Sequence, residues 1–235
     1  MEMQRQTAYS SEKSSEMMHG MHGGKFPFRP FLFCSCVVKY YQPKMAEEGL
    51  LLKWLQHLRT VQHHRFLVLR HCWRVGLYRQ GLTHDLSKFS PVEFAAGARY
   101  YQGNRSPNNA EREATGLSTA WIHHYGRNKH HFEHWVDYGI DCDTIIKGVP
   151  MPRNYIAEMV MDRICASKVY HPESYTNRAP LEYFLKSKGK LWFVHEDTNR
   201  DLEFLLRMLA EKGEKETLCY IRNSYLKGKE IKNSH

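Results

Sequence analysis

The segment 81–94, GLTHDLSKFSPVEF, places a histidine and an aspartate side by side. Lys88 follows three residues after this His84-Asp85 pair. Imidazole nitrogens and carboxylate oxygens both bind divalent transition metals, so the pair predicts a metal site if other segments supply further ligands. The histidine content, 15 in 235 residues, supports this prediction because many of the histidines fall between His57 and His134.

Candidate ligands for the same ion occur on both sides of the pair. They are His64, the doublets His123-His124 and His130-His131, and Asp162. Asp162 is the least expected on structural grounds because its predicted helix face is otherwise apolar or small. An ionised carboxylate there needs a cation, a metal or several hydrogen bonds, and a salt bridge to a nearby Arg or Lys is the alternative. Isolated histidines are more often surface or hydrogen-bonded groups, which is our interpretation of His57 and His134.

The order of these residues resembles the HD superfamily of helical metal-dependent phosphohydrolases. A closer resemblance, over residues 50–210, is to an uncharacterised microbial and viral family. The stretches that carry it are HDLSKFSPVEF (84–94), AWIHH (120–124), RNKHHFEHW (127–135) and EMVMD (158–162). These strings are long, so they are specific for that narrow family, whereas His-Asp alone is a common dipeptide.

The HD resemblance implies a set of metal ligands. The first metal would be held by His64, His84, Asp85 and Asp162, and His124 and His131 would complete a second site. One or two divalent ions are therefore expected, and imidazole and carboxylate suit Fe, Mn, Co, Ni or Zn alike. His71, followed by Val75, competes with His64 for the role of first ligand.

The same resemblance implies roles in catalysis. Lys88 would contact a substrate phosphate, and Arg127 could do the same. His123 or His130, whichever is not a ligand, would serve as general acid to the leaving group, because imidazole titrates near neutral pH. The expected reaction is hydrolysis of a phosphoester in a phosphorylated small molecule or nucleotide.

Two other functions remain open. A His/Asp ligand set of this order also resembles the di-iron oxygenases related to myo-inositol oxygenase. The third possibility is a non-enzymatic, basic helical protein that binds nucleic acid, which the net charge of +9 favours. The sequence shows neither a dense Arg/Lys stripe nor a recognisable nucleic-acid module, which argues against it.

Hydrophobic periodicity predicts an all-α fold, and the resemblance makes it an HD-domain-like helical bundle. Ser90 is a good N-cap, Pro91 fits the first helical position, and Glu93 can complete a capping box. The only strand-like run is 191–194. A first helix is predicted over 47–80, with a change of face near residue 62 and a stop at Gly81. Shorter helices are predicted over 91–102 and from Ser118 or Thr119 to His124, with a further turn after Asn128. The last two are predicted over 154–170 and over 198–212, the latter with a stop at Gly213.

Composition divides the chain into three parts. Residues 1–44 are expected to be a disordered or loosely packed extension, because polar residues, glycine and methionine dominate its first half. Residues 45–213 form the predicted helical domain, and residues 214–235 a charged, solvated tail. The apolar run 31–38 is too short to span a membrane. We expect no membrane association, and the oligomeric state stays open.

The six cysteines are scattered without a C-x-x-C pair. We therefore expect reduced thiols in an intracellular, cytoplasmic protein, with Cys72 and Cys165 packed in the core.

Overall fold

The computed structural model describes the backbone of residues 35–140 and 145–229, and side chains from residue 49 onward. The chain divides into two units, 1–41 and 42–235, and the second carries all the features below. The expectation of a loose extension over 1–44 falls largely outside the described residues. Helix α1, however, begins at Ser35, inside that segment.

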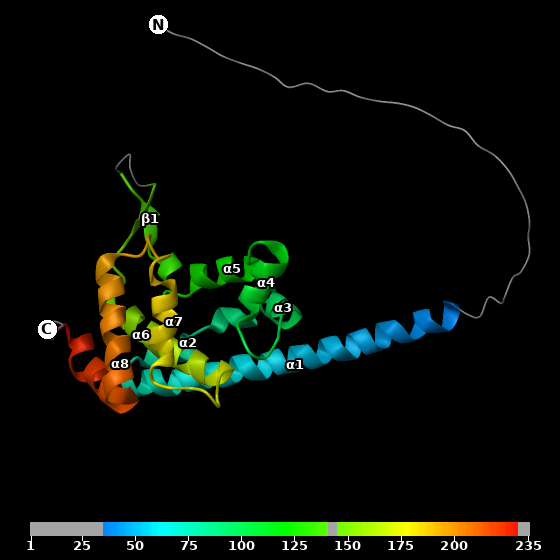
Figure 1. Ribbon diagram of the computed structural model, residues 1–235, viewed down its shortest axis with the longest axis horizontal. Coiled ribbons are helices and arrows are strands. Elements are labelled where there is room, and N and C mark those ends of the chain that lie inside the picture. Colours follow the sequence, from blue (N-terminus) through cyan, green and yellow to red (C-terminus); the bar gives the residue numbers. More distant parts are fainter. Residues whose placement is uncertain (1–34, 141–144, 230–235) are drawn as a thin grey trace, which may run out of the picture. The chain divides into compact units, whose positions relative to one another are not determined.

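Within the described residues the fold is all-α with one small hairpin, which confirms the predicted class (Figure 1). The α-helices are α1 (Ser35–Val75), α2 (Tyr78–Thr83), α3 (Pro91–Arg99), α4 (Pro107–Thr115), α5 (Thr119–Arg127), α6 (Arg153–Tyr170), α7 (Ala179–Lys188) and α8 (Glu196–Asn223). Short 3₁₀ turns cover Leu86–Phe89, Phe132–His134 and Tyr225–Lys227, and strands β1 (Val136–Tyr138) and β2 (Ile146–Gly148) pair antiparallel. None of the described helices has an apolar stretch long enough to cross a membrane.

The core lies where α6, α7 and α8 pack against one another, next to the C-terminal half of α1 (Figure 1). Helix α8 contributes a row of leucines that are completely buried: Leu202, Leu205, Leu206 and Leu209. Cys72 of α1 and Cys165 of α6 are buried in the same core, as expected. Burial of this apolar surface is the main force that fixes α1 and α6, the two long helices that carry site residues.

Glycines at the end of α1 act differently from the prediction. The helix ends at Gly76, whose φ of +89° is a left-handed conformation that favours glycine. Gly81 does not stop a helix but lies within α2, where an added Cβ would stand 2.9 Å from the Cβ of Cys72. The predicted stop at Gly81 is therefore wrong, because that glycine allows α2 to pack closely on α1.

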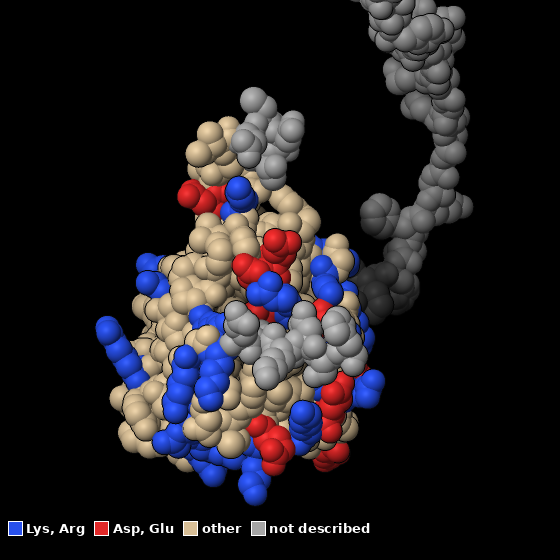
Figure 2. All heavy atoms as spheres, turned by 90° about the vertical axis from the view of Figure 1, so that its left-hand side faces the viewer, with Lys and Arg blue, Asp and Glu red and all other residues tan. Residues whose placement is uncertain are grey.

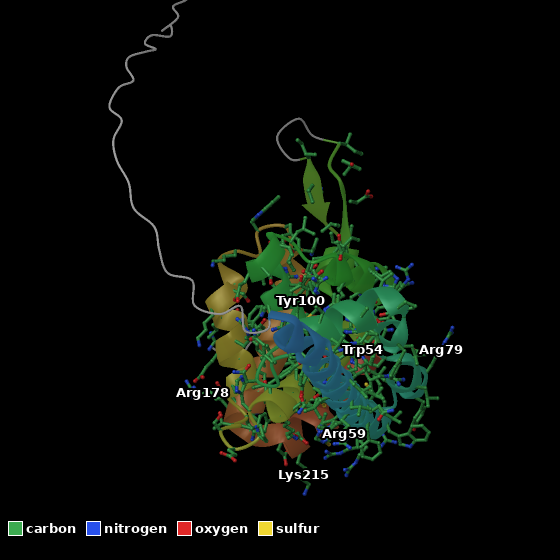
Figure 3. The ribbon with its side chains drawn as sticks, turned by 90° about the vertical axis from the view of Figure 1, so that its right-hand side faces the viewer. Trp54, Arg59, Arg79, Tyr100, Arg178 and Lys215 are labelled. Carbon is green, nitrogen blue, oxygen red and sulfur yellow. The ribbon has the colours of Figure 1, made fainter. Side chains whose placement is uncertain are left out.

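The start of α3 is confirmed. The Ser90 hydroxyl accepts a hydrogen bond from the backbone N–H of Glu93 at 3.4 Å, and Pro91 occupies the first turn. Trp54 of α1, labelled in Figure 3, meets Phe94 of α3 edge to face, with ring centroids 5.4 Å apart. These contacts fix α3 against α1.

The two strands do not lie where the sequence suggested one. Residues 191–194 form a turn, in which Phe193 and Val194 pack against the core. The actual strands, 136–138 and 146–148, pair with Asp137 opposite Lys147. The segment after Asn128 forms turns and a short 3₁₀ helix, in agreement with the predicted turn.

Helix α8 continues well beyond its predicted end. Gly213 has φ +80° and ψ 173°, so the helix kinks there and resumes. The segment expected to be a solvated tail instead buries Leu218, Ile221 and Tyr225. The Tyr225 hydroxyl donates to an Asp201 carboxylate oxygen at 3.0 Å, which ties this end to the first half of α8.

Candidate metal centre

Four separate parts of the chain converge on one buried group of imidazoles and carboxylates. They are α1, the turn between α2 and α3, the segment from α5 through the following turn, and α6. The converging residues are His64, His84, Asp85, His124, His130, His131 and Asp162. Five of them are buried to 6% exposure or less, and Asp162 and His131 are partly exposed.

The first cluster consists of His64, His84, Asp85 and Asp162. The His64 Nε2 atom lies 3.3 Å from His84 Nε2, 3.0 Å from Asp162 Oδ1 and 3.7 Å from Asp85 Oδ2. His84 Nε2 is 3.4 Å from Asp85 Oδ2 and 3.7 Å from Asp162 Oδ1. A tetrahedral site with bonds of about 2.1 Å separates its ligand atoms by about 3.4 Å, so these spacings suit one ion.

The second cluster consists of Asp85, His124, His130 and His131. Asp85 Oδ1 lies 3.3 Å from His124 Nε2 and 3.4 Å from His130 Nε2. The Nε2 atoms of His124 and His131 are 3.0 Å apart. Two ring nitrogens at such a distance share at most one proton, whereas a cation satisfies both lone pairs.

Asp85 belongs to both clusters, one carboxylate oxygen facing each. Its φ of +53° is left-handed, which is uncommon for a residue other than glycine and is better tolerated by Asp than by most. The Arg65 Nε donates to the backbone oxygen of His84 at 2.8 Å, which helps to hold the turn. Backbone strain of this kind marks a position whose side-chain direction matters.

Glu158 of α6 forms a third possible metal-binding group with His84 and His130, on the Nδ1 side of both rings. Its Oε1 lies 2.9 Å from His84 Nδ1 and 3.2 Å from His130 Nδ1, so it accepts from both N–H groups. Its Oε2 accepts from Gln80 Nε2 at 2.8 Å. The proton that each ring keeps on Nδ1 leaves Nε2 as the nitrogen that would bind an ion once any proton on it is released, as in the usual carboxylate–histidine–metal arrangement.

Glu93 plays the same part for the histidines of α5. Its Oε2 lies 2.7 Å from His124 Nδ1 and its Oε1 lies 2.6 Å from His123 Nδ1. The predicted capping box is therefore wrong, because the Glu93 carboxylate turns to α5 instead of returning to Ser90. Charge-assisted hydrogen bonds to two imidazoles are stronger than the single bond that a capping box would offer.

The pKa shifts of three site residues reflect both their burial and the charges of their neighbours. Burial raises the pKa of Glu158, but hydrogen bonds from His130 and His84 hold it at about 2. Burial also opposes the charged form of His84, yet the Asp85 carboxylate and hydrogen bonds to Asp162 and Glu158 raise its pKa to about 10. Burial and the neighbouring His130 and His124 keep the pKa of His131 well below its usual value, so this ring is neutral.

Two buried atoms of the second cluster have no hydrogen-bond partner in the described part of the chain. They are Asp85 Oδ1 and His130 Nε2, which face each other at 3.4 Å. Buried polar atoms are nearly always satisfied, and leaving one unpaired costs about 1–3 kcal/mol. An ion bound by both atoms would remove this cost, so the donor set fits a metal.

Lys88 forms an ion pair with Asp85, with its Nζ 2.6 Å from Oδ2. Its side chain keeps 29% of its exposure, so part of it is open to solvent. Burial lowers the pKa of Lys88, but Asp85 outweighs this and raises it well above the usual value. The lysine therefore stays charged at the edge of the site.

The other predicted residues lie outside the two clusters. His123 touches Glu93 but belongs to neither cluster. Arg127 is exposed and donates to the backbone oxygen of His123 at 3.3 Å. His71 lies 3.1 Å from Glu214 Oε1, so the structure brings His64 and not His71 into the first cluster. His57 packs against Phe94, and burial followed by the charge of Lys88 lowers its pKa to about 4.

Asp162 has histidine partners. Among the described residues its carboxylate pairs with His64 and His84, and not with Lys or Arg. Its pKa lies well below the usual value because hydrogen bonds from these two histidines overcome the effect of burial. The two side chains lie close enough for one ion to bridge them, with 3.7 Å between Asp162 Oδ1 and His84 Nε2.

The sequence reasoning missed the two supporting carboxylates. Glu158 precedes Asp162 by four residues, so both lie on one face of α6, a spacing that could have indicated the second acid. Glu93 was instead interpreted as a helix-capping residue. Both residues are acids on helices that also carry apolar or small residues, in a chain rich in histidine, and that combination is the signal common to both.

The fold and the site define an all-α protein with buried histidine and carboxylate clusters that can hold metal ions. The chain belongs to a family of unknown function, DUF5662, whose family model matches residues 53–208. No curated protein and no solved structure matches the chain. The matched segment contains both clusters, and the family has no assigned activity.

Proposed function

We propose that the protein is a metal-dependent phosphohydrolase of the HD type, whose two clusters hold divalent transition-metal ions and whose substrate is a phosphorylated small molecule or nucleotide. The observation that carries this proposal is the set of rings held by carboxylates from behind. Glu158 and Glu93 accept from the Nδ1 atoms of His84, His130 and His124, and the Nε2 atoms converge on Asp85. Such rings are prepared for metal binding.

In this proposal each cluster holds one ion. The first ion is bound by the four residues of the first cluster, as the HD resemblance implies. The second is bound by Asp85, His124 and His131, together with His130, which was one of two candidates for the general acid. Ions in these positions would supply Lewis acidity at a phosphoryl oxygen and lower the pKa of water towards neutrality.

The chain's own residues supply the remaining functions. Lys88 is charged and partly exposed beside the first cluster, so it can bind a phosphate oxygen. Arg127 is exposed one helical turn after His123 and can do the same. His123 keeps 18% exposure and has Nδ1 fixed by Glu93, which leaves its other nitrogen to hold or transfer a proton to the leaving group.

Metal content tests the proposal directly. The full chain would be loaded in turn with Fe, Mn, Co, Ni and Zn, desalted, and measured by elemental analysis, then screened against phosphomonoesters with each metal. We expect up to two ions per chain. His84→Ala and Asp162→Ala should each lose the ion of the first cluster. His63→Ala is the matched control, because His63 neighbours His64 but is exposed.

The outcomes are separable. Full metal content in His84→Ala and Asp162→Ala would remove the basis of the proposal, as would equal loss in His63→Ala. Metal binding without hydrolysis of any phosphoester would leave the metal centre intact and refute the hydrolase.

A di-iron oxygenase is the second candidate. The observation that favours it is the second cluster, which contains three imidazoles and one carboxylate, ligands that suit iron as well as zinc. Oxygen consumption by the iron-loaded protein, absent with zinc, would support this reaction over hydrolysis.

Binding of nucleic acid is the third candidate. Figure 2 shows Lys and Arg side chains spread over one face of the protein, with Asp and Glu in fewer places, in keeping with the net charge of +9. Binding that weakens steeply with salt and does not depend on metal would favour this function.

A further inference from the structure

Arg163 of α6 is a charged residue whose side-chain donors are largely unused. Its guanidinium carbon lies 5.6 Å from the ring centre of Phe132, 5.7 Å from Tyr183 and 5.8 Å from Phe184. The Nε and Nη1 atoms are buried and have no hydrogen-bond partner in the part of the chain that the structure describes. Aromatic rings stabilise the charge through their faces but cannot replace in-plane acceptors.

Another arginine on the same helix shows the usual solution. Arg153 lies over the Tyr225 ring at 5.0 Å, and its Nη1 donates to the backbone oxygens of Tyr225 and Lys229 at 3.1 and 2.9 Å. Arg153 therefore combines ring contact with satisfied donors. Among the residues that the structure describes, Arg163 has the ring contacts alone, although a buried ion needs hydrogen-bond partners more than an exposed one does.

Arg163 and one of its ring neighbours adjoin the two clusters in the sequence. It directly follows Asp162, a member of the first cluster, and its ring neighbour Phe132 directly follows His131, a member of the second. Burial lowers the pKa of Arg163, while the electrostatic effects of Tyr183, Asp162 and Glu133 oppose that change. Neither carboxylate forms a salt bridge with it within the described residues; Glu133 accepts instead from Trp121 Nε1 at 3.2 Å.

We propose that Arg163 is an anion-binding residue, whose free N–H groups receive an oxyanion of the phosphate class on a ligand that reaches the metal clusters. This inference rests on the proposed function, since it names the group that holds the substrate's phosphate. The planar guanidinium presents adjacent N–H donors at the spacing of two phosphate oxygens. A phosphate there would supply the acceptors that the described part of the chain does not.

Inorganic phosphate is the probe. Its affinity for the metal-loaded full chain and for the metal-free chain would be measured by calorimetry, in wild type, Arg163→Met, Arg163→Lys and Arg153→Met. We expect Arg163→Met to weaken phosphate binding at least tenfold. Arg163→Lys, which keeps the charge but loses the planar fork, should fall between. Arg153→Met is the matched control and should bind phosphate as wild type does.

Thermal unfolding separates binding from a structural role. Arg163→Met should unfold at the wild-type temperature or above it, because a buried unpaired charge has been removed. Arg153→Met should unfold at a lower temperature, because two backbone oxygens lose their donor. Wild-type phosphate affinity in Arg163→Met, no phosphate binding by wild type, or a lowered unfolding temperature in both Arg163 variants would each overturn the inference. Metal content, measured on the same samples, decides the proposed function separately.

Discussion

Glu158→Gln is the most informative single change, because one carboxylate supports a histidine in each cluster. In the wild type its Oε1 accepts from His84 and His130, and its Oε2 accepts from Gln80. Glutamine has the same shape but carries one acceptor oxygen, one NH₂ donor and no charge. The substitution therefore tests whether the negative charge and both oxygens are needed.

The hydrogen-bond pattern fixes how the new amide would turn. Gln80 Nε2 already donates to the backbone oxygen of Asn154 at 3.0 Å as well as to Glu158, so it cannot readily turn its own oxygen towards position 158. If the oxygen of the new amide faces the two rings, one contact becomes donor against donor. If its NH₂ faces the rings, two contacts do. The first arrangement costs less, so both rings keep a neutral acceptor.

The expected magnitude follows from that arrangement. Loss of a carboxylate behind a metal-binding histidine commonly weakens metal affinity 10- to 100-fold. With an acceptor retained we expect about tenfold in each cluster, equivalent to about 1.4 kcal/mol per ion. Glu158→Ala removes the acceptor altogether and should approach about 100-fold in each cluster. Glu93 supports only His124 among the cluster residues, so Glu93→Gln should weaken the binding of the second ion alone.

The assay is a competition titration of the metal-free protein with zinc against a chromophoric chelator, fitted to two binding steps. Glu182→Gln is the control, because Glu182 is 57% exposed on α7 and pairs only loosely with Arg178, which lies at the outside in Figure 3. If Glu158→Gln weakens one step or neither, or if Glu182→Gln weakens both equally, the reasoning that Glu158 serves both clusters is refuted.

Three further predictions concern stability. Gly97→Ala should cost about 1–3 kcal/mol of unfolding free energy by chemical denaturation, because the new methyl group would collide with the His57 ring between α3 and α1; an unchanged midpoint would contradict that contact. The hydrogen bond from His71, against the effect of burial, lowers the pKa of Glu214 to about 2 from its ordinary 4.5. The carboxylate therefore stabilises the fold above pH 4.5, and this stabilisation is lost as the pH falls towards 2. After allowance for solvent screening, Glu214→Gln should cost about 1–2 kcal/mol at pH 7 and progressively less below pH 4.5; a difference that grows in acid would show the opposite linkage. The zinc-loaded protein would be kept at a free zinc concentration about 100 times the dissociation constant, and the zinc then removed with a chelator. Removal should lower the free energy of unfolding by about 2.7 kcal/mol per ion, seen as a lower melting temperature; an unchanged melting temperature would show that no ion binds the folded state.

Some of the site could be predicted because its signals are local in the sequence. Asp162 stands out as an acid on an apolar helix face, and His84-Asp85 lies just before the strong start of α3 at Ser90. The structure places Asp162 with His64 and His84. Such residues are conspicuous because a buried charge needs a partner, whatever the fold.

The supporting residues could not be predicted in the same way. Whether Glu93 returns to its own helix or reaches α5 depends on how closely α3 and α5 pack, which no local pattern encodes. His130 and His131 are adjacent, and only the turn conformation decides which ring nitrogen faces Asp85. The sequence therefore located the doublet without determining the ring directions.

Helix ends at glycines were also hard to predict, because they too depend on tertiary packing. Gly76 and Gly81 both suit a helix stop, but only Gly76 takes a left-handed conformation, while Gly81 faces the Cys72 side chain. Gly213 is left-handed too, yet α8 resumes because Leu218 and Ile221 beyond it are drawn into the core. Tertiary packing decides which meaning a glycine has.

The ion pair between Lys88 and Asp85 means that a side chain of the protein competes with a metal ion for a ligand of the first cluster. With the ammonium 2.6 Å from Oδ2, an incoming ion would compete with a lysine already in contact with a shared ligand. A singly charged ion would gain little by that exchange, whereas a divalent ion gains more from each oxygen. Displacement would free the lysine for a negatively charged ligand only after the metal has arrived, so the chain itself would impose an order of loading.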